Sequence, residues 1–79
     1  MPELIADREV DITRDVCPMT FVRTRLALDR LNPGQTLLVR LRGDEPLRNV
    51  PRTAAGQGHA VLSLTAEADG THLLLLRRG

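Results

Sequence analysis

The fold is decided by a stretch near the N-terminus, residues 8–20, which reads REVDITRDVCPMT. In its first five residues, acidic side chains alternate with valine and isoleucine, the period of two expected of a half-buried strand. Cys17 and Pro18 follow, and the chain then contains neither proline nor glycine until it has passed residue 31. Because proline is favoured at the first helical position, we expect a strand over 8–12 and a helix over 18–31.

Strand signals dominate the remainder of the chain. Pro33-Gly34 ends the first helix and leads into a mostly apolar run of strand length, residues 36–41. Residues 60–66 alternate apolar side chains with serine and threonine, and residues 71–76 are rich in leucine. Between these two runs, residues 67–70 read EADG and contain the Asp-Gly signal of a hairpin turn.

A second helix is expected between the strands at 36–41 and 60–66, and its prolines predict an interruption. Pro46 is compatible with a first helical turn, but Pro51 removes a backbone donor about one turn later. We therefore expect a one-turn segment near residues 47–49, followed by a separate helix over about 51–57.

The order of elements, β-α-β-α-β-β, predicts the fold class. Two crossovers around helices predict two parallel strand pairs, and the closing hairpin predicts an antiparallel pair. The economical packing is an α+β two-layer sandwich, a four-stranded mixed sheet with both helices on one face. Residues 1–79 are expected to form a single domain, because that length is about half of a typical one. We expect residues 77–79 to be a frayed tail.

Composition excludes several classes of function. The formal net charge is only +1, and Phe21 is the single aromatic residue, so neither a general nucleic-acid binder nor a single-strand stacking platform is indicated. All 11 cationic side chains are arginines, so a P-loop or a Schiff-base mechanism, each of which needs lysine, is excluded. We expect no direct nucleic-acid partner, no cofactor, no metal and no small-molecule pocket.

The cysteine content indicates the compartment. With one cysteine the chain cannot form an internal disulfide, which points to a reducing setting. No apolar run approaches the ~18 residues of a membrane span, and no signal peptide is visible. The expected localisation is cytoplasmic, with no membrane contact.

Cys17 is the principal candidate for chemistry. Placed before Pro18, it is expected at the N-cap of the first helix, beside the backbone N–H groups of Met19 and Thr20. These donors and the helix dipole favour a thiolate. The carboxylate of Asp15 opposes a second anion. Without a neighbouring base, such a thiolate suits sulfur or disulfide exchange better than acyl transfer.

Arg14 and Arg23 are close enough in the sequence to offset the negative charge of the Asp15 carboxylate. The competing interpretation of Cys17 is an inert, buried small hydrophobe. The two histidines, His59 and His72, are interpreted as structural and solvent-facing, respectively.

The first helix carries two apolar stripes at helical spacing. Phe21, Thr24, Leu28 and Leu31 are the expected core face. Met19, Val22 and Leu26 form the second stripe, which is either a widening of the buried face or an exposed docking strip beside Cys17. We favour docking, with Arg14 and Arg23 contributing charge to the same surface.

The sequence resembles the TusA/SirA family of small sulfur carriers over most of its length. The resemblance is carried by an ordered set of residues: Asp11, Cys17-Pro18, Pro33-Gly34, Asp44-Glu45-Pro46, Val50-Pro51 and Gly58-His59. Two positions depart from the family motif, in which an aspartate and a glycine precede Cys-Pro-x-Pro. Arg14 stands where the family has the glycine, and Thr20 stands at the second proline.

The resemblance implies that Cys17 accepts sulfane sulfur as a persulfide and relays it. The implied partners are a sulfur-donor protein, of the cysteine desulfurase or rhodanese type, and an acceptor protein, for example toward tRNA thiolation. The alternative is a non-catalytic interaction or regulatory module of the same fold.

Overall fold

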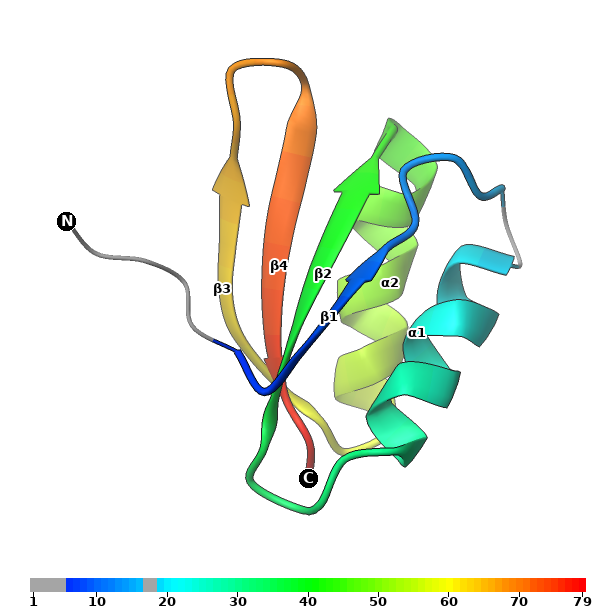
Figure 1. Cartoon of the computed structure of the whole chain (residues 1–79). Helices are drawn as coiled ribbons and strands as arrows, with labels where there is room; N and C mark the ends of the chain where they lie inside the picture. The colour runs from blue at the N-terminus through cyan, green and yellow to red at the C-terminus, as the bar shows by residue number, and fades with distance from the viewer. Residues whose placement is uncertain (1–5, 17–18) are drawn as a thin grey trace, which may run out of the picture.

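The structure, a computed structural model, describes residues 6–16 and 19–79. Two helices lie on one face of a four-stranded sheet (Figure 1). The elements, in chain order, are β1 Arg8–Asp11, α1 Met19–Asp29, β2 Thr36–Arg42, α2 Asp44–Gly56, β3 Ala60–Ala66 and β4 Thr71–Arg77. The predicted α+β two-layer fold is confirmed. No helix in the described part of the chain is long and apolar enough to cross a membrane.

The sheet order is β1-β2-β4-β3, so the last strand lies between the second and the third. β1 and β2 are parallel, whereas β4 is antiparallel to both of its neighbours. The prediction of a second adjacent parallel pair is therefore wrong. β4 contains four consecutive leucines, two of which, Leu74 and Leu76, are fully buried. The most apolar strand takes the central position, and β3, whose large side chains are exposed, takes the edge.

The core lies between the sheet and the two helices. It consists of fully or almost fully buried apolar side chains from both layers: Ile12, Leu28, Leu31, Leu37, Val39, Leu41, Val50, Ala54, Leu74 and Leu76. On α1, the expected core positions Thr24, Leu28 and Leu31 are buried, while Phe21 is half-buried. Burial of each large aliphatic side chain contributes about 1.5–3 kcal/mol. The core therefore fixes α1 against the sheet and positions the loop that precedes it.

α2 is one continuous helix, so the predicted interruption at Pro51 is wrong. Proline removes one backbone donor from a helix and crowds the carbonyl four residues earlier, but the residues around it can remain helical if packing holds them. Val50 and Ala54 are completely buried against the sheet, and Leu47 packs against the same core. Contacts on both sides of Pro51 thus hold the helix together.

The C-terminal residues are anchored and not frayed. The Arg78 backbone N–H donates to the Gln35 carbonyl at 2.8 Å, and the Arg78 carbonyl accepts from Gly34 at 2.9 Å. The Arg78 guanidinium Nε donates to the Leu28 carbonyl at 2.9 Å. The Gly79 N–H donates to His59 Nδ1 at 3.1 Å. Backbone pairing therefore extends beyond β4 and joins the end of the chain to the loop after α1.

The sheet face away from the helices carries an ion-pair network. Arg40 lies 3.1 Å from Glu67 and 3.5 Å from Glu9. These pairs connect β2 to β1 and to the turn after β3. Leu38, which points to the same face as Arg40 by strand alternation, is only 6% exposed although it is not part of the core between sheet and helices. The side chains of the sheet thus cover part of this face themselves.

Candidate functional site

The candidate site lies where the parallel strands β1 and β2 end and lead into α1 and α2 (Figure 1). This edge is the usual position for ligands in folds with parallel strands, because the loops and helix N-termini converge there. Cys17 and Pro18 belong to the segment between β1 and α1 but lie outside the described residues. Their neighbours Val16 and Met19 are described, and their side chains are 75% and 47% exposed.

The start of this segment is ordered by Asp11. Its Oδ1 accepts hydrogen bonds from the Thr13 hydroxyl at 2.7 Å and from the Thr13 N–H at 2.9 Å. These two bonds, in that order of importance, hold the pKa of the Asp11 carboxyl below its usual value. The Asp15 N–H donates to the Ile12 carbonyl at 3.1 Å, which turns the chain away from the sheet. The aspartate that the family motif contains therefore serves the turn that leads to Cys17.

The N–H groups expected to stand free at the start of α1 are bonded. The Met19 and Thr20 N–H groups both donate to the Val16 carbonyl, at 2.8 and 3.3 Å. The expectation of two free donors facing a sulfur anion is therefore not met in this conformation. The N-cap geometry predicted for Cys17 and Pro18 lies outside the described residues.

Thr20 has a role that the sequence analysis missed. Its side chain is 1% exposed, and its hydroxyl has no hydrogen-bond partner within the described residues. Its carbonyl accepts a 2.8 Å hydrogen bond from the Thr24 hydroxyl. Thr20, Thr24 and Leu28 are spaced four residues apart, and this helical spacing is the sequence signal that places Thr20 on the core stripe. Where the family motif has its second proline, this chain therefore has a threonine packed into the core.

The second apolar stripe of α1 is exposed, as the docking interpretation expects. Met19, Val22 and Leu26 are 47%, 39% and 56% exposed. Val16, in the loop before α1, is a further exposed apolar residue, which no periodic pattern marked. The docking function of this surface remains a prediction.

Charged side chains lie around the same edge. Arg23 Nη1 donates to Asp15 Oδ2 at 2.6 Å, so the two residues form an ion pair, while Arg14 is exposed. A shallow surface depression of about 390 Å³ lies between the loop after β1 and the start of α2. It is lined by Asp15, Val16, Arg42, Glu45 and Pro46. The site is thus an open surface of mixed charge with exposed apolar side chains.

Neither histidine is close to a metal-binding arrangement. His59 accepts a hydrogen bond from the end of the chain, in agreement with a structural role. His72 is half-buried, which corrects the expectation that it faces solvent. Among residues 6–16 and 19–79, no group of three or more His, Cys, Asp or Glu side chains could hold a metal ion.

The fold is a small α+β sandwich, and the only cysteine of the sequence lies between the parallel strand β1 and the helix α1, as in a small single-cysteine α+β protein. The sequence profile of the family described as sulfurtransferase TusA matches residues 8–78, and the chain belongs to this family. The resemblance inferred from Cys17-Pro18 and the later motifs is thereby confirmed.

Relatives with assigned descriptions agree with this result. The protein is 32% identical over 76 residues to a "Putative sulfur carrier protein" of Archaeoglobus fulgidus, covering 96% of this chain and 86% of the relative. A protein of the same description from Methanocaldococcus jannaschii is 31% identical over 75 residues, covering 95% and 99% of the two chains.

A solved structure shares the fold. The crystal structure of a SirA-like protein from Desulfitobacterium hafniense superposes with a TM-score of 0.80 at 23% sequence identity, covering 91% of this chain and 97% of that one. At this level of identity the likeness establishes the four-stranded sheet with its two helices.

Proposed function

We propose that the protein is a sulfur carrier in which Cys17 holds sulfane sulfur as a persulfide. The observation that carries the proposal is the position of the chain's only cysteine between Val16 and Met19, whose side chains are both exposed. A donor or acceptor protein can contact Val16 and Met19, on the two sides of Cys17-Pro18 in the sequence, without the chain unfolding. Membership of the TusA family and the descriptions of the relatives support the same function.

The proposed transfer needs no oxidant or reductant. The Cys17 thiolate attacks the outer sulfur of a donor persulfide, a new S–S bond forms, and the donor leaves as a thiolate. A nucleophile of the acceptor then attacks the terminal sulfur, and Cys17 returns as a thiolate. Since the chain has no second cysteine to resolve the persulfide as an internal disulfide, the cargo must leave to another molecule.

In this proposal α1 contributes the positive end of its dipole, which stabilises an anion at its N-terminus. The Arg23 guanidinium contributes by neutralising Asp15, the carboxylate closest to Cys17 in the sequence. The stripe Met19, Val22 and Leu26, with Arg14 and Arg23, provides the surface on which the partners dock. The donor is a protein of the cysteine desulfurase or rhodanese type, and the exchange takes place in the reducing cytoplasm.

The experiment is persulfide loading followed by intact mass spectrometry. The protein is mixed with a cysteine desulfurase and free cysteine, and the expected product has gained one sulfur atom that dithiothreitol removes. Cys17→Ser is the matched control and should gain nothing. The proposal fails if Cys17 remains unmodified while the desulfurase itself carries a persulfide.

A second candidate function is a non-catalytic interaction module of the same fold. It is favoured by the bonding of the Met19 and Thr20 N–H groups to Val16, which leaves these two donors unavailable to an anion. The rate of Cys17 alkylation as a function of pH separates the candidates. An inert cysteine reacts with the pH dependence of a model thiol, and Cys17→Ser then supports partner binding and function at the normal level.

A further inference from the structure

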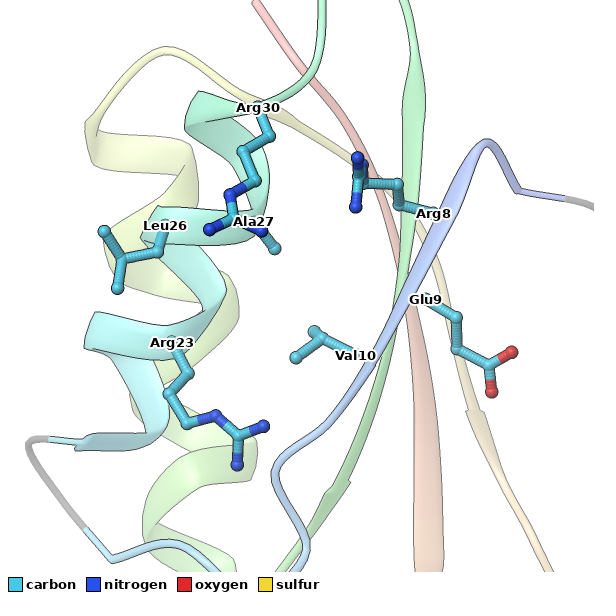
Figure 2. A pocket seen from close by; sticks show the side chains of 7 residues that line it. All are labelled: Arg8, Glu9, Val10, Arg23, Leu26, Ala27 and Arg30. Carbon is cyan, nitrogen blue, oxygen red and sulfur yellow. The ribbon is translucent and has the colours of Figure 1, made fainter.

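A groove runs between the outer edge of β1 and the side of α1. Its volume is about 240 Å³, and its walls include Arg8 and Val10 from β1, Arg23 and Leu26 from α1, and Arg30, which directly follows α1. Figure 2 shows the guanidinium groups of Arg8 and Arg23 extending into the space between the strand and the helix, with Val10 between them. The groove therefore brings together three cationic side chains, from β1, from α1 and from the turn that follows α1.

The acidic side chains nearest in sequence to Arg8 are directed elsewhere. Asp7 accepts hydrogen bonds from the Thr36 N–H at 2.8 Å and from the Thr36 hydroxyl at 3.2 Å. Glu9 also lines the groove, but its carboxylate points away from α1 in Figure 2 and pairs with Arg40 at 3.5 Å on the opposite face of the sheet. The carboxylates of Asp7 and Glu9 are thus engaged by Thr36 and Arg40, and neither forms an ion pair with an arginine of the groove.

The guanidinium groups of the groove are only partly compensated. Among the described residues, neither Arg8 nor Arg30 has a carboxylate within 4.0 Å. The Arg23 guanidinium forms an ion pair with Asp15. The local charge is therefore positive although the whole chain carries only +1. Such a surface attracts an acidic partner and accelerates its association.

An apolar side chain lies on the same wall as two of the arginines. Leu26 is 56% exposed and lines the groove between Arg23 and Arg30 along α1. It also belongs to the stripe with Val22 and Met19, so the groove is continuous with the surface beside Cys17. Arginine is enriched at protein interfaces and among the residues that dominate their binding energy, and an exposed aliphatic side chain beside it offers apolar area for a partner to cover.

We propose that this groove binds an acidic, partly apolar segment of a partner protein, with carboxylates between Arg8 and Arg30 and an apolar side chain on Leu26. The inference rests on the proposed function for the identity of the partner, which is a protein that exchanges sulfur with Cys17. It assigns to Arg8 and Arg30 a role in docking that the sequence did not indicate, because they are far apart in the chain and only the fold brings them together.

An acidic protein segment fits this groove better than a nucleic acid or a small inorganic anion does. A nucleic acid would be expected to engage a longer basic surface and stacked aromatic rings, but the chain has a net charge of +1 and one aromatic residue. A small inorganic anion gains most from buried, convergent donors, whereas Arg8, Arg23 and Arg30 are all exposed and lie beside an apolar side chain. Carboxylates combined with aliphatic side chains match both features.

The first experiment measures persulfide loading of Cys17 by a cysteine desulfurase. In the double variant Arg8→Gln/Arg30→Gln the second-order rate should fall about 10-fold at low salt, because steering and the carboxylate contacts are lost. The matched control is Arg48→Gln/Arg52→Gln on α2, which removes the same charge from outside the groove and should change the rate less than about twofold. Equal rates in the two double variants would overturn the proposal that the groove binds the partner. They would leave the sulfur-carrier function intact.

The second experiment is independent of sulfur chemistry. A peptide of alternating glutamate and leucine is titrated into the labelled protein, and backbone amide signals are followed by nuclear magnetic resonance. The proposal expects shifts at Arg8, Val10, Leu26 and Arg30 that vanish in Arg8→Gln/Arg30→Gln, whose spectrum also verifies its fold. Absent shifts, or equal shifts with sodium sulfate, an oligouridylate or the corresponding lysine-leucine peptide, would overturn it.

A charge reversal distinguishes the groove from a general effect of net charge. Arg8→Glu/Arg30→Glu should lose the glutamate-leucine peptide and bind the lysine-leucine peptide at the same amides. If the peptide binds the wild-type groove but Cys17 never accepts sulfur, the docking surface stands and the sulfur-carrier function fails. If the reversed variant keeps its preference for the acidic peptide, the groove is not the binding site.

Discussion

Arg23 Nη1 lies 2.6 Å from Asp15 Oδ2, and this ion pair ties the second turn of α1 to the loop that precedes Cys17. The pair is partly exposed, with 46% of the Arg23 side chain and 22% of the Asp15 side chain accessible. An exposed pair of this kind contributes about 0–1 kcal/mol to stability. Its main consequence is electrostatic, because Asp15 is two residues from Cys17 and Arg23 compensates its charge.

Breaking the pair from either side should change the reactivity of Cys17 in opposite directions. Two residues span at most ~7 Å of chain, where a unit charge in water is worth about 0.5–1 kcal/mol. Asp15→Asn should therefore accelerate alkylation of Cys17 by iodoacetamide about two- to threefold near neutral pH, and Arg23→Gln should slow it by a similar factor. The control is the double variant, which should react at close to the wild-type rate. The same change in rate in both single variants would contradict this account.

The elements of the fold were predictable because each carries a local signal. Alternation marked β1 and β3, the Asp-Gly turn marked the hairpin, and Pro33-Gly34 ended α1. The order of the strands was not predictable from such signals. It depends on which strand can be buried on both faces, a property that emerges when the four leucines of β4 are compared with the exposed side chains of β3.

The candidate site was predictable in part. The stripe of Met19, Val22 and Leu26 followed from helical spacing, its exposure agrees with the docking interpretation, and the role of Cys17 stays a prediction. The bonding of the Met19 and Thr20 N–H groups to Val16 was not, because it depends on the path of the loop and not on residue type. The groove at Arg8 and Arg30 joins β1 to α1 and the turn after it, and neither segment carries a sequence signature of the groove.

Pro51 is expected to weaken α2 although the helix continues through it. Pro51→Ala restores a backbone donor opposite the Leu47 carbonyl, four residues earlier. The gain in the free energy of unfolding should be about 1–2 kcal/mol, smaller than the ~3 kcal/mol difference in helix propensity because alanine makes the unfolded chain more flexible. Urea denaturation followed by circular dichroism measures this change.

Pro46→Ala is the matched control for Pro51→Ala. Pro46 lies in the first turn of α2, where a backbone N–H has no acceptor within the helix, so alanine should change stability by less than about 1 kcal/mol. Equal stabilisation by the two substitutions would show that the missing hydrogen bond at Pro51 is not the cause.

Asp11 should titrate below its ordinary range because of Thr13. Its pKa is lowered first by the hydrogen bond from the Thr13 hydroxyl and then by the bond from the Thr13 N–H. A carboxyl with a lowered folded-state pKa stabilises the fold above its unfolded value of about 3.9, and this contribution is lost as the pH falls through the folded-state pKa. Acidification below about pH 4 should therefore loosen the turn before Cys17.

Thr13→Ala tests this assignment, since it removes the first hydrogen bond and keeps the second. The pKa of the Asp11 carboxyl should rise toward the ordinary value without reaching it, as measured by carbon-13 titration of the side chain. Thr13→Ser retains the hydroxyl and should leave the pKa low. An unchanged pKa in Thr13→Ala would assign the shift to another cause.

Arg78 should stabilise the end of α1 through its side chain. Its Nε donates to the Leu28 carbonyl at 2.9 Å, and a cation at a helix C-terminus is favoured by the helix dipole. Arg78→Gln should lower the free energy of unfolding by about 1–2 kcal/mol, the usual cost of losing a partly buried hydrogen bond from a charged donor. Arg77→Gln is the control, because it removes the same charge from an exposed position at the end of β4 and should cost less than about 0.5 kcal/mol. Urea denaturation measures both values, and amide exchange at Arg30 and Leu31 should accelerate only in Arg78→Gln. If Arg77→Gln destabilises the protein as much as Arg78→Gln, the effect belongs to net charge and not to the contact with Leu28.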